Sequence, residues 1–264
     1  MSEILSTHFD KTGILRLTLQ DNARRNALSE AMLKALIAEI GKASEMPDVK
    51  VIILAAQGPA FSSGHDLKDM TAKRAQADGG RDYFAHILTL CSQLMKDIIA
   101  CPKPVIAEVA GVATAAGCQL VASCDLAIAA QTARFSTPGV HIGLFCSTPM
   151  VALSRNIAHK QAMEMLLTGD MISAQRARDI GLVNRVVPEA DLTEETLSLA
   201  QQIAAKSSHT IAIGKRAFYE QAQMDLKQAY DFTSDVMVNN MLTPDAREGI
   251  GAFIEKRKPK WSDS

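Results

Sequence analysis

Two turns rich in small residues carry the clearest chemical potential in this sequence. One is FSSGHDL (residues 61–67), which follows the apolar run 51–54, and the other follows Gly111 within the segment 105–130. Small residues let a ligand approach the backbone, and the first amides of a helix lack an intrahelical acceptor and carry the positive end of the helix dipole. Two such turns at strand ends predict a pair of backbone N–H groups that stabilise a negatively charged oxygen, an oxyanion hole.

Several other catalytic motifs are missing from the sequence. It contains neither GxGxxG nor GxxxxGK[ST], the fingerprints of dinucleotide and Walker-type phosphate sites, and neither HExxH nor another metal-ligand spacing. Ser62 and Ser63 precede a glycine, but without the GxSxG pattern of serine hydrolases. The five cysteines, at positions 91, 101, 118, 124 and 146, form no CxxC pair and lie in apolar segments. We therefore expect no metal, no nucleotide cofactor, and reduced, buried thiols.

The composition favours a small-molecule partner. Among 264 residues, 28 Lys and Arg balance 29 Asp and Glu, so a general attraction to nucleic acid or to an anionic membrane is not expected. The basic segment 255–260 is interpreted as a solvated face, with phosphate binding as the alternative. No apolar run reaches membrane-spanning length, and Met1 to Leu5 lack the pattern of a signal peptide. We expect a soluble protein of the cytoplasm or, as a mature form, of an organellar matrix.

Alternating strand and helix patterns predict an α/β fold that ends in a series of helices. Residues 10–13 are expected to form a hairpin turn, Ser29 and Asp66 to cap helices, and residues 135–139 (FSTPG) to form an exposed turn. The expected strands cover residues 4–9, 14–19, 50–56, 105–109, 126–129 and 182–187. The expected helices run from Ser29 to Pro47, as a short piece after Asp66, and over residues 81–100, 115–123, 163–167, 174–180, 191–206, 209–221, 226–240 and 244–256.

Several spaced motifs, in order along the chain, resemble one known family. They are FSSGHDLKDM at 61–70, KPVIA at 103–107 and the segment from Gly111 to Asp125, followed by FSTPG at 135–139, GLVNRVVP at 181–188 and the stretch 248–259. Together they cover nearly the whole chain. The sequence resembles the crotonase, or enoyl-CoA hydratase/isomerase, superfamily.

This resemblance implies a fold, an assembly and a class of ligand. Residues 1–190 are expected to form a crotonase-like spiral of ββα turns. Residues 191–264 are expected to form a C-terminal helical region that mediates homotrimers, which commonly pair into homohexamers, and that covers the active site. The implied ligands are acyl-CoA thioesters, with coenzyme A as part of the substrate and with no metal or redox cofactor.

The resemblance also assigns roles to individual residues. The backbone amides of His65 and Ala116 would form the oxyanion hole and stabilise the enolate oxygen of the thioester, at roughly 3–4 kcal/mol per donor. The side chain of His65 either lines the pocket or takes part in acid–base chemistry, and Asp66 is expected to cap a helix. Residues implied to contact the substrate are Arg24, Ser63, Gly64, Asp66, Leu67, Lys68, Ala115, Pro138 and His141, with Phe253 and Lys256 supplied by a neighbouring subunit.

The chain departs from the family pattern at two positions. Hydratases of this family hold a water between two glutamates, and the corresponding positions here are Gln119 and Gly139. Neither residue can exchange a proton, and a positioned acid or base typically contributes about 10²–10⁴ in rate. Gly139 is expected to leave an open space where a carboxylate would stand.

Three interpretations remain open from the sequence. In the first, the protein is an acyl-CoA enzyme whose proton chemistry comes from other groups. Those candidates are His65, His141, Glu108 and Asp66, or a water or small anion beside Gly139, although Glu108 could equally pair with a basic neighbour. In the second, it binds acyl-CoA without turnover. In the third, it is a structural or regulatory oligomer with a vestigial pocket.

Overall fold

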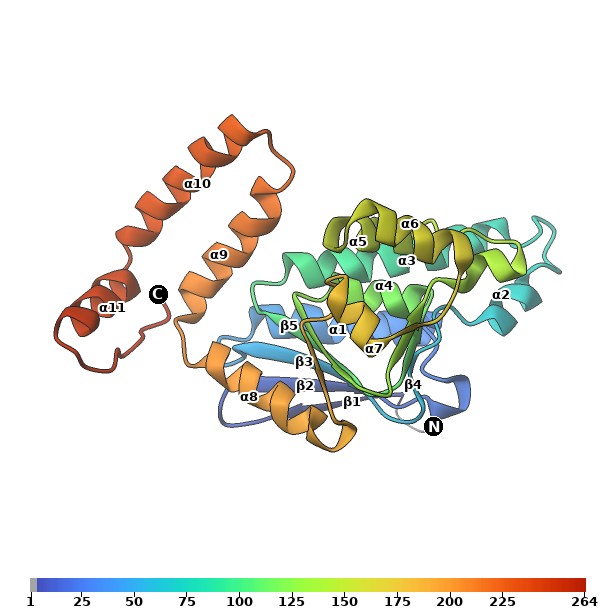
Figure 1. The fold of residues 1–264 in the computed structure, drawn as a ribbon, viewed down its shortest axis with the longest axis horizontal. Helices are drawn as coiled ribbons and strands as arrows, with labels where there is room; N and C mark the ends of the chain where they lie inside the picture. The colour runs from blue at the N-terminus through green and yellow to red at the C-terminus, as the bar shows by residue number, and fades with distance from the viewer. Residues whose placement is uncertain (1–3) are drawn as a thin grey trace.

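The computed structural model describes residues 4–264, and two sheets form its centre (Figure 1). A six-stranded sheet has the order β1-β2-β3-β5-β7-β10, and a four-stranded sheet has the order β4-β6-β8-β9. The expectation that Met1 to Leu5 lack a signal peptide rests partly on residues 1–3, which lie outside the described residues.

The elements alternate along the chain as the sequence predicts. The strands are β1 (Leu5–Phe9), β2 (Ile14–Leu19), β3 (Val51–Ala56), β4 (Ala60–Ser62), β5 (Val105–Val109), β6 (Val112–Thr114), β7 (Leu126–Ala130), β8 (Arg134–Ser136), β9 (Ile172–Ser173) and β10 (Arg185–Val187). The helices are α1 (Glu30–Glu45), α2 (Leu67–Lys73), α3 (Arg81–Ala100), α4 (Ala116–Ser123), α5 (Pro149–Asn156), α6 (His159–Thr168), α7 (Ala174–Asp179), α8 (Leu192–Ala204), α9 (Ser208–Gln221), α10 (Leu226–Met241) and α11 (Pro244–Ile254). Short 3₁₀ turns cover Asn22–Arg24, Pro138–Ile142 and Glu189–Asp191.

Local sequence signals set several of these boundaries. The Ser29 hydroxyl accepts a hydrogen bond from the Met32 amide at 3.3 Å, so it caps α1 as predicted. Helix α3 spans the predicted residues 81–100, because its apolar residues recur at helical spacing. Within residues 4–264, no helix is long and apolar enough to cross a membrane.

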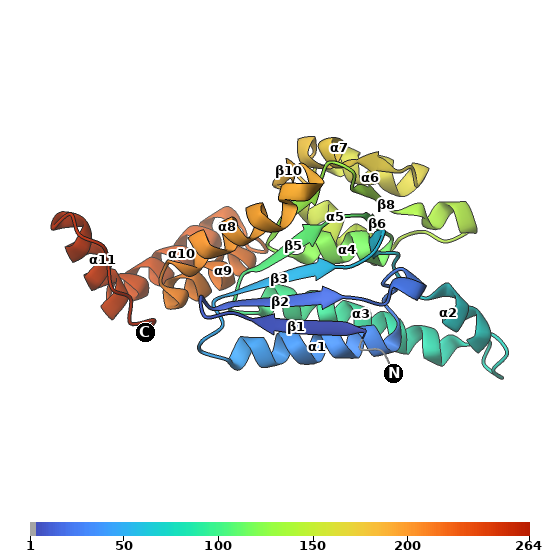
Figure 2. The same ribbon diagram turned by 90° about the horizontal axis from the view of Figure 1, so that it is seen from below.

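The larger sheet is covered on both faces. Ile52, Leu54 and Ala107 point into the main core with α1, α3 and α4, whereas Ile53 and Ile106 point toward Ala200 of α8. Figure 1 shows α8 on one side of the sheet and α3 and α4 on the other, and Figure 2 shows the strands from β1 to β5 side by side. Buried parallel strands read as continuous apolar runs because neither face meets solvent, and this explains the sequence of β3 and β5.

The smaller sheet supplies the second strand of each turn of the spiral. Strand β3 leads into β4, β5 into β6 and β7 into β8, with helices following, which is the crotonase-like order of ββα units that we expected. Strands β4, β6 and β8 have three residues each, too few for a period-2 pattern, so the sequence analysis missed them. The expectation of an exposed turn at 135–139 is wrong, because β8 pairs with β6 and buries Phe135, Ser136 and Thr137 completely.

The C-terminal helices differ in their relation to the sheets. Helix α8 packs on the larger sheet through Leu192 and Ala200, whereas α9, α10 and α11 extend away from it as an arm (Figure 1). Exposed apolar side chains are numerous on this arm, among them Phe218, Tyr230, Met237, Val238, Leu242, Phe253 and Ile254. The proposed division at residue 190 and the role of residues 191–264 in assembly and in covering the site stay predictions.

Candidate active site

The first small-residue turn follows β4 and is held by backbone contacts with residues 24–28. The Gly64 carbonyl accepts a hydrogen bond from the Leu28 amide at 2.7 Å, and the Ser63 amide donates to the Arg25 carbonyl at 3.1 Å. Gly64 has a φ of +83°, in the left-handed region that glycine adopts without strain. The chain turns at Gly64 because of this conformation. His65 comes next, two residues before α2 begins at Leu67.

The second turn joins β6 to α4. Ala115 has a φ of +50°, an uncommon conformation for a residue with a side chain, and its amide donates to the Ser136 carbonyl at 3.0 Å. The positive φ therefore falls on Ala115, whereas Ala116 has an ordinary negative φ as the first residue of α4. An alanine with a negative φ adopts this conformation without strain, and its amide remains available as a donor.

The two turns lie against each other, as the sequence analysis predicts. A Cβ atom built on Gly64 would lie 3.0 Å from the Ala115 Cβ and 3.1 Å from the Ala116 nitrogen. The Thr114 hydroxyl also donates to the Ser63 carbonyl at 3.2 Å. Among residues 4–264, no acceptor receives a hydrogen bond from the His65 or Ala116 amide. Two free backbone donors from neighbouring turns are thus brought together.

His65 is a half-buried residue whose ring nitrogens are shielded from solvent. Both ring nitrogens are inaccessible to solvent and lack a hydrogen-bond partner in the described part of the chain. Burial lowers the pKa of His65 below its usual 6.5, and the nearby Leu28 backbone opposes this shift only partly. The imidazole is therefore neutral at neutral pH. A buried neutral ring has one donor and one acceptor to satisfy, and such orphaned groups are rare in folded proteins.

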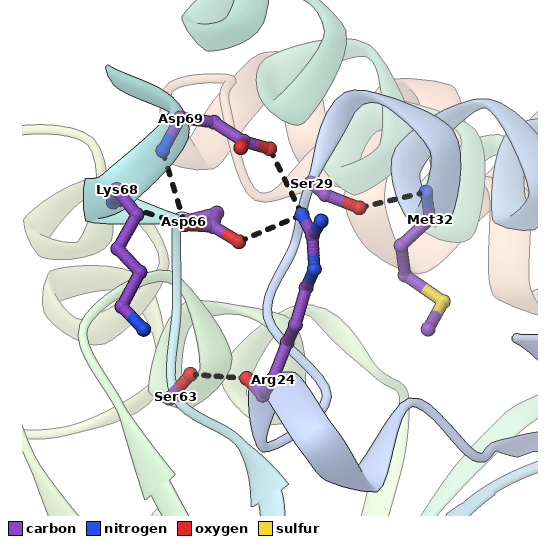
Figure 3. Close-up of polar contacts among 7 residues, drawn as sticks. All are labelled: Arg24, Ser29, Met32, Ser63, Asp66, Lys68 and Asp69. Atoms are coloured by element: carbon purple, nitrogen blue, oxygen red, sulfur yellow. Dashed lines mark hydrogen bonds and ion pairs between the residues drawn. The ribbon is translucent and has the colours of Figure 1, made fainter. Parts of the chain in front are cut away.

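Asp66 caps α2 and pairs with Arg24 (Figure 3). Its Oδ1 accepts hydrogen bonds from the Lys68 amide at 2.9 Å and the Asp69 amide at 3.2 Å. Arg24 Nη1 lies 3.1 Å from both Asp66 Oδ2 and Asp69 Oδ2, and these charges raise the pKa of Arg24, that of Asp69 most strongly. Asp66 as an N-cap is confirmed, and its carboxylate is committed to the cap and the ion pair.

Two cationic side chains near the first turn, Arg24 and Lys68, differ in whether they are already paired with a carboxylate. Arg24 is half-exposed but already paired with two carboxylates, and the Ser63 hydroxyl donates to its carbonyl at 3.4 Å. The Lys68 ammonium has no ion-pair partner within residues 4–264, and Figure 3 shows its side chain extending away from Asp66 and Asp69. Lys68 is the more available of the two for an anionic ligand, and Leu67 beside it is exposed.

Gln119 and Gly139 both contact buried thiols. Gln119 is a buried residue of α4, and its Oε1 lies 4.0 Å from the Cys91 sulfur of α3. Gly139 is buried in the 3₁₀ turn that begins at Pro138, and a Cβ built on it would lie 2.8 Å from the Leu144 carbonyl oxygen and 3.0 Å from Cys146 Sγ. The expectation of an open space beside Gly139 is therefore wrong, because these two groups fill it.

Two other acid–base candidates are engaged elsewhere. His141 is exposed, and its Nε2 lies 2.8 Å from the Thr168 carbonyl oxygen. Glu108 forms an ion pair with Arg16 and accepts a hydrogen bond from the Thr193 hydroxyl at 3.1 Å, on the sheet face that packs against α8. The alternative in which Glu108 pairs with a basic neighbour is confirmed. Neither residue joins the two turns.

Phe253 and Lys256 lie far from these turns within one chain. Figures 1 and 2 both place α11 at the end of the molecule opposite α2. Phe253 is 84% exposed, and Lys256 follows the end of α11. That these residues act from a neighbouring subunit stays a prediction.

The remaining candidates for chemistry are few. Within residues 4–264, no group of three or more His, Cys, Asp and Glu side chains is placed to hold a metal ion. All five cysteines are buried and unpaired, as predicted. Burial raises the pKa of Cys91 and Cys118 to about 12, so both are protonated and unreactive at neutral pH. The contact of Gly139 with Leu144 and Cys146 was not predicted, because nothing in the spacing of these residues indicates it.

Known proteins are similar to this chain in sequence and in fold. Residues 10–264 match the family model described as enoyl-CoA hydratase/isomerase. The human protein named enoyl-CoA hydratase domain-containing protein 3, mitochondrial, is 52% identical over 250 residues, which are 95% of this chain and 81% of the relative. The crystal structure of that human protein superposes with a TM-score of 0.93 at 50% identity, over 98% of this chain and 100% of the other.

A bacterial structure gives the same result. Enoyl-CoA hydratase of Mycobacterium smegmatis superposes with a TM-score of 0.94 at 47% identity, over 98% of this chain and 99% of the other. The chain therefore belongs to the enoyl-CoA hydratase/isomerase family and resembles the branch named enoyl-CoA hydratase domain-containing protein 3.

Proposed function

We propose that this protein binds acyl-CoA thioesters and stabilises the enolate form of the thioester with the backbone amides of His65 and Ala116. The observation that carries the proposal is the contact between the two turns, which leaves both amides without an acceptor in residues 4–264. Fixed donors of this kind stabilise a developing oxyanion without reorganising during the reaction. Members of this family bind acyl-CoA substrates, and the full-length match supports the same ligand class here.

The proton chemistry of this proposal falls to His65. Gln119 and Gly139 offer no acid or base side chain, Asp66 is committed to its cap, and Glu108 and His141 bond elsewhere. The neutral imidazole of His65 is the titratable side chain closest in sequence to the oxyanion donors, and its ring nitrogens are unpaired in the described chain. Hydration of a 2-enoyl-CoA by a water held between two carboxylates is not part of the proposal.

A second candidate function is binding of acyl-CoA without turnover. Gln119 and Gly139 favour it, because they stand where the family has glutamates and neither side chain supplies an acid or a base. In this form the protein is a non-catalytic acyl-CoA-binding or regulatory oligomer. Both candidate functions use the same amides, need no metal or redox cofactor, and differ in whether product forms.

Assembly and location complete the proposal. The exposed apolar side chains of α9, α10 and α11 favour a homotrimer or homohexamer, in which Phe253 and Lys256 of one chain reach the site of another. The relatives named as mitochondrial favour an organellar matrix. The near-neutral charge balance argues against nucleic acid as a partner.

The deciding experiment is turnover of purified protein with short- and medium-chain 2-enoyl-CoA, followed by loss of the conjugated thioester absorbance. The key variant is Ala116→Pro, because proline is tolerated at the first position of a helix but has no N–H to donate. Removing one oxyanion donor lowers kcat by about 10²–10³. Calorimetric titration with butyryl-CoA then separates a binding protein from one that binds no acyl-CoA.

His159→Pro is the matched control. His159 is the exposed first residue of α6, so the same substitution is made at the same helical position away from the two turns. We expect the control to retain activity and the native melting temperature. Equal activity in wild type and Ala116→Pro would reject the oxyanion role, and the absence of both turnover and binding would reject the acyl-CoA assignment.

A further inference from the structure

The segment that follows Gly139 folds back on it. The Leu144 amide donates to the Gly139 carbonyl at 2.9 Å, which closes the 3₁₀ turn into a tight loop. Cys146 then lies at the foot of α5, where its carbonyl accepts a hydrogen bond from the Met150 amide at 3.0 Å. Both ends of this short segment are therefore fixed, one by the turn and the other by the helix.

The loop leaves no room for a side chain at position 139. A Cβ atom there would lie 2.8 Å from the Leu144 oxygen, 3.0 Å from Cys146 Sγ and 3.3 Å from the Cys146 nitrogen. The 2.8 Å contact is too short to form without a shift of the backbone, and the contacts at 3.0 and 3.3 Å are tight. Because two of the three atoms belong to the backbone, rotation of a side chain cannot relieve the overlap.

The thiol belongs to the same hydrophobic core as the helix that carries the oxyanion donor. Cys146 is a member of the buried cluster that includes Ala116 and Cys118 of α4. Cys146 itself is 8% exposed, the largest value among the five cysteines. Burial raises its own pKa, so the group is a neutral thiol. The thiol thus lies against Gly139, in the core cluster that also holds the start of α4.

We infer that Cys146 and Gly139 form an interlocked pair in which the thiol takes the place of a side chain at position 139 and forms that part of the wall of the acyl-CoA site. The location of this wall rests on the proposed function, whereas the interlock rests on the contacts alone. The wall therefore presents sulfur and backbone instead of a carboxylate. A glutamate restored at position 139 cannot occupy the site unless the segment 144–146 moves.

A double-mutant cycle tests the interlock without any ligand. Gly139→Ala is made in the wild type and in Cys146→Ala, and melting temperatures are compared. We expect Gly139→Ala to lower the melting temperature strongly in the wild type and less in Cys146→Ala, where the sulfur is gone. Gly41→Ala is the control, because a Cβ at Gly41 meets nothing within 4 Å. Equal losses in both backgrounds would overturn the interlock.

Thiol labelling tests the position of the wall. The native protein is treated with iodoacetamide with and without butyryl-CoA, and each cysteine is quantified by mass spectrometry. At a ligand concentration of 100 times Kd about 1% of the protein is free, so labelling of Cys146 falls by up to about 100-fold. Cys101, which follows the end of α3 and is 2% exposed, is the internal control and keeps its labelling rate.

The outcomes separate this inference from the proposed function. If calorimetry shows butyryl-CoA bound and Cys146 labels at an unchanged rate, the wall is misplaced and the inference fails. Equal protection of Cys146 and Cys101 reports general stabilisation and contradicts the inference as well. If no butyryl-CoA binds at all, the proposed function fails, and the double-mutant cycle still decides the interlock.

Discussion

Lys215 of α9 and Asp125, which precedes β7, form an ion pair with Nζ and Oδ2 2.6 Å apart and side chains only 7% and 14% exposed. The ammonium also donates to the Ile98 carbonyl at 2.9 Å and the Lys103 carbonyl at 3.0 Å. Asp125 accepts further hydrogen bonds from the Val105 amide and the Tyr219 hydroxyl. This network joins the C-terminal arm to the start of β5 and to the end of α3.

We expect Lys215→Met to lower the free energy of unfolding by about 3–5 kcal/mol, because it leaves the Asp125 carboxylate buried without its cation. Denaturant unfolding monitored by circular dichroism measures the loss. Lys227→Met is the control, since Lys227 and Asp231 form an exposed pair on α10 that is worth about 0–1 kcal/mol. Similar losses in the two variants would mean that the buried network does not hold the arm.

Gly64→Ala is expected to disturb both turns. The substitution places a side chain at a φ of +83° and a Cβ 3.1 Å from the Ala116 nitrogen, so we expect a loss of roughly 1–3 kcal/mol in stability. Acyl-CoA binding weakens in parallel because the two amides are pushed apart. Thermal unfolding and calorimetric titration measure the two effects. Gly41→Ala, in the middle of α1, is expected to keep or raise stability.

Asp66→Ala separates the cap from the charge when it is compared with Asp66→Ser. The alanine variant loses the side-chain bonds to the Lys68 and Asp69 amides, and we expect it to be about 0.5–2 kcal/mol less stable. The serine variant keeps an N-cap oxygen but loses the ion pair with Arg24, so most of the stability returns. Equal destabilisation of both variants would show that the ion pair, and not the cap, holds this turn.

The stability of the protein is expected to depend on the protonation of His65. Burial lowers the pKa of this ring in the folded state, so the unfolded chain binds the proton more readily. The free energy of unfolding therefore falls as pH drops below the unfolded value of 6.5 and stops falling once pH is below the folded pKa. His65→Phe removes this pH dependence. The difference in the free energy of unfolding between variant and wild type therefore changes between the folded and the unfolded pKa of His65. Parallel pH profiles for the two proteins would contradict the buried neutral imidazole.

The sequence by itself determined the strands of the larger sheet, most of the helices and the family. Apolar residues at helical spacing defined α3 to the residue, Ser29 and Asp66 marked two helix starts, and the motifs around Gly64 and Ala116 indicated the two turns and the family. These features are local, because a cap or a periodic face acts over a few neighbouring residues.

Only the tertiary structure decided what surrounds the site. Glu108 and His141 remained acid–base candidates in the sequence, and their partners Arg16 and Thr168 come from distant parts of the chain. The short strands β4, β6 and β8 exist because they pair with each other, and that pairing buries residues 135–137. Gly139 was expected to leave a space, yet the chain folds back and fills it with the Leu144 carbonyl and the Cys146 thiol. Close packing fills such volumes with whichever atoms the fold brings there, and no local pattern records which atoms those are.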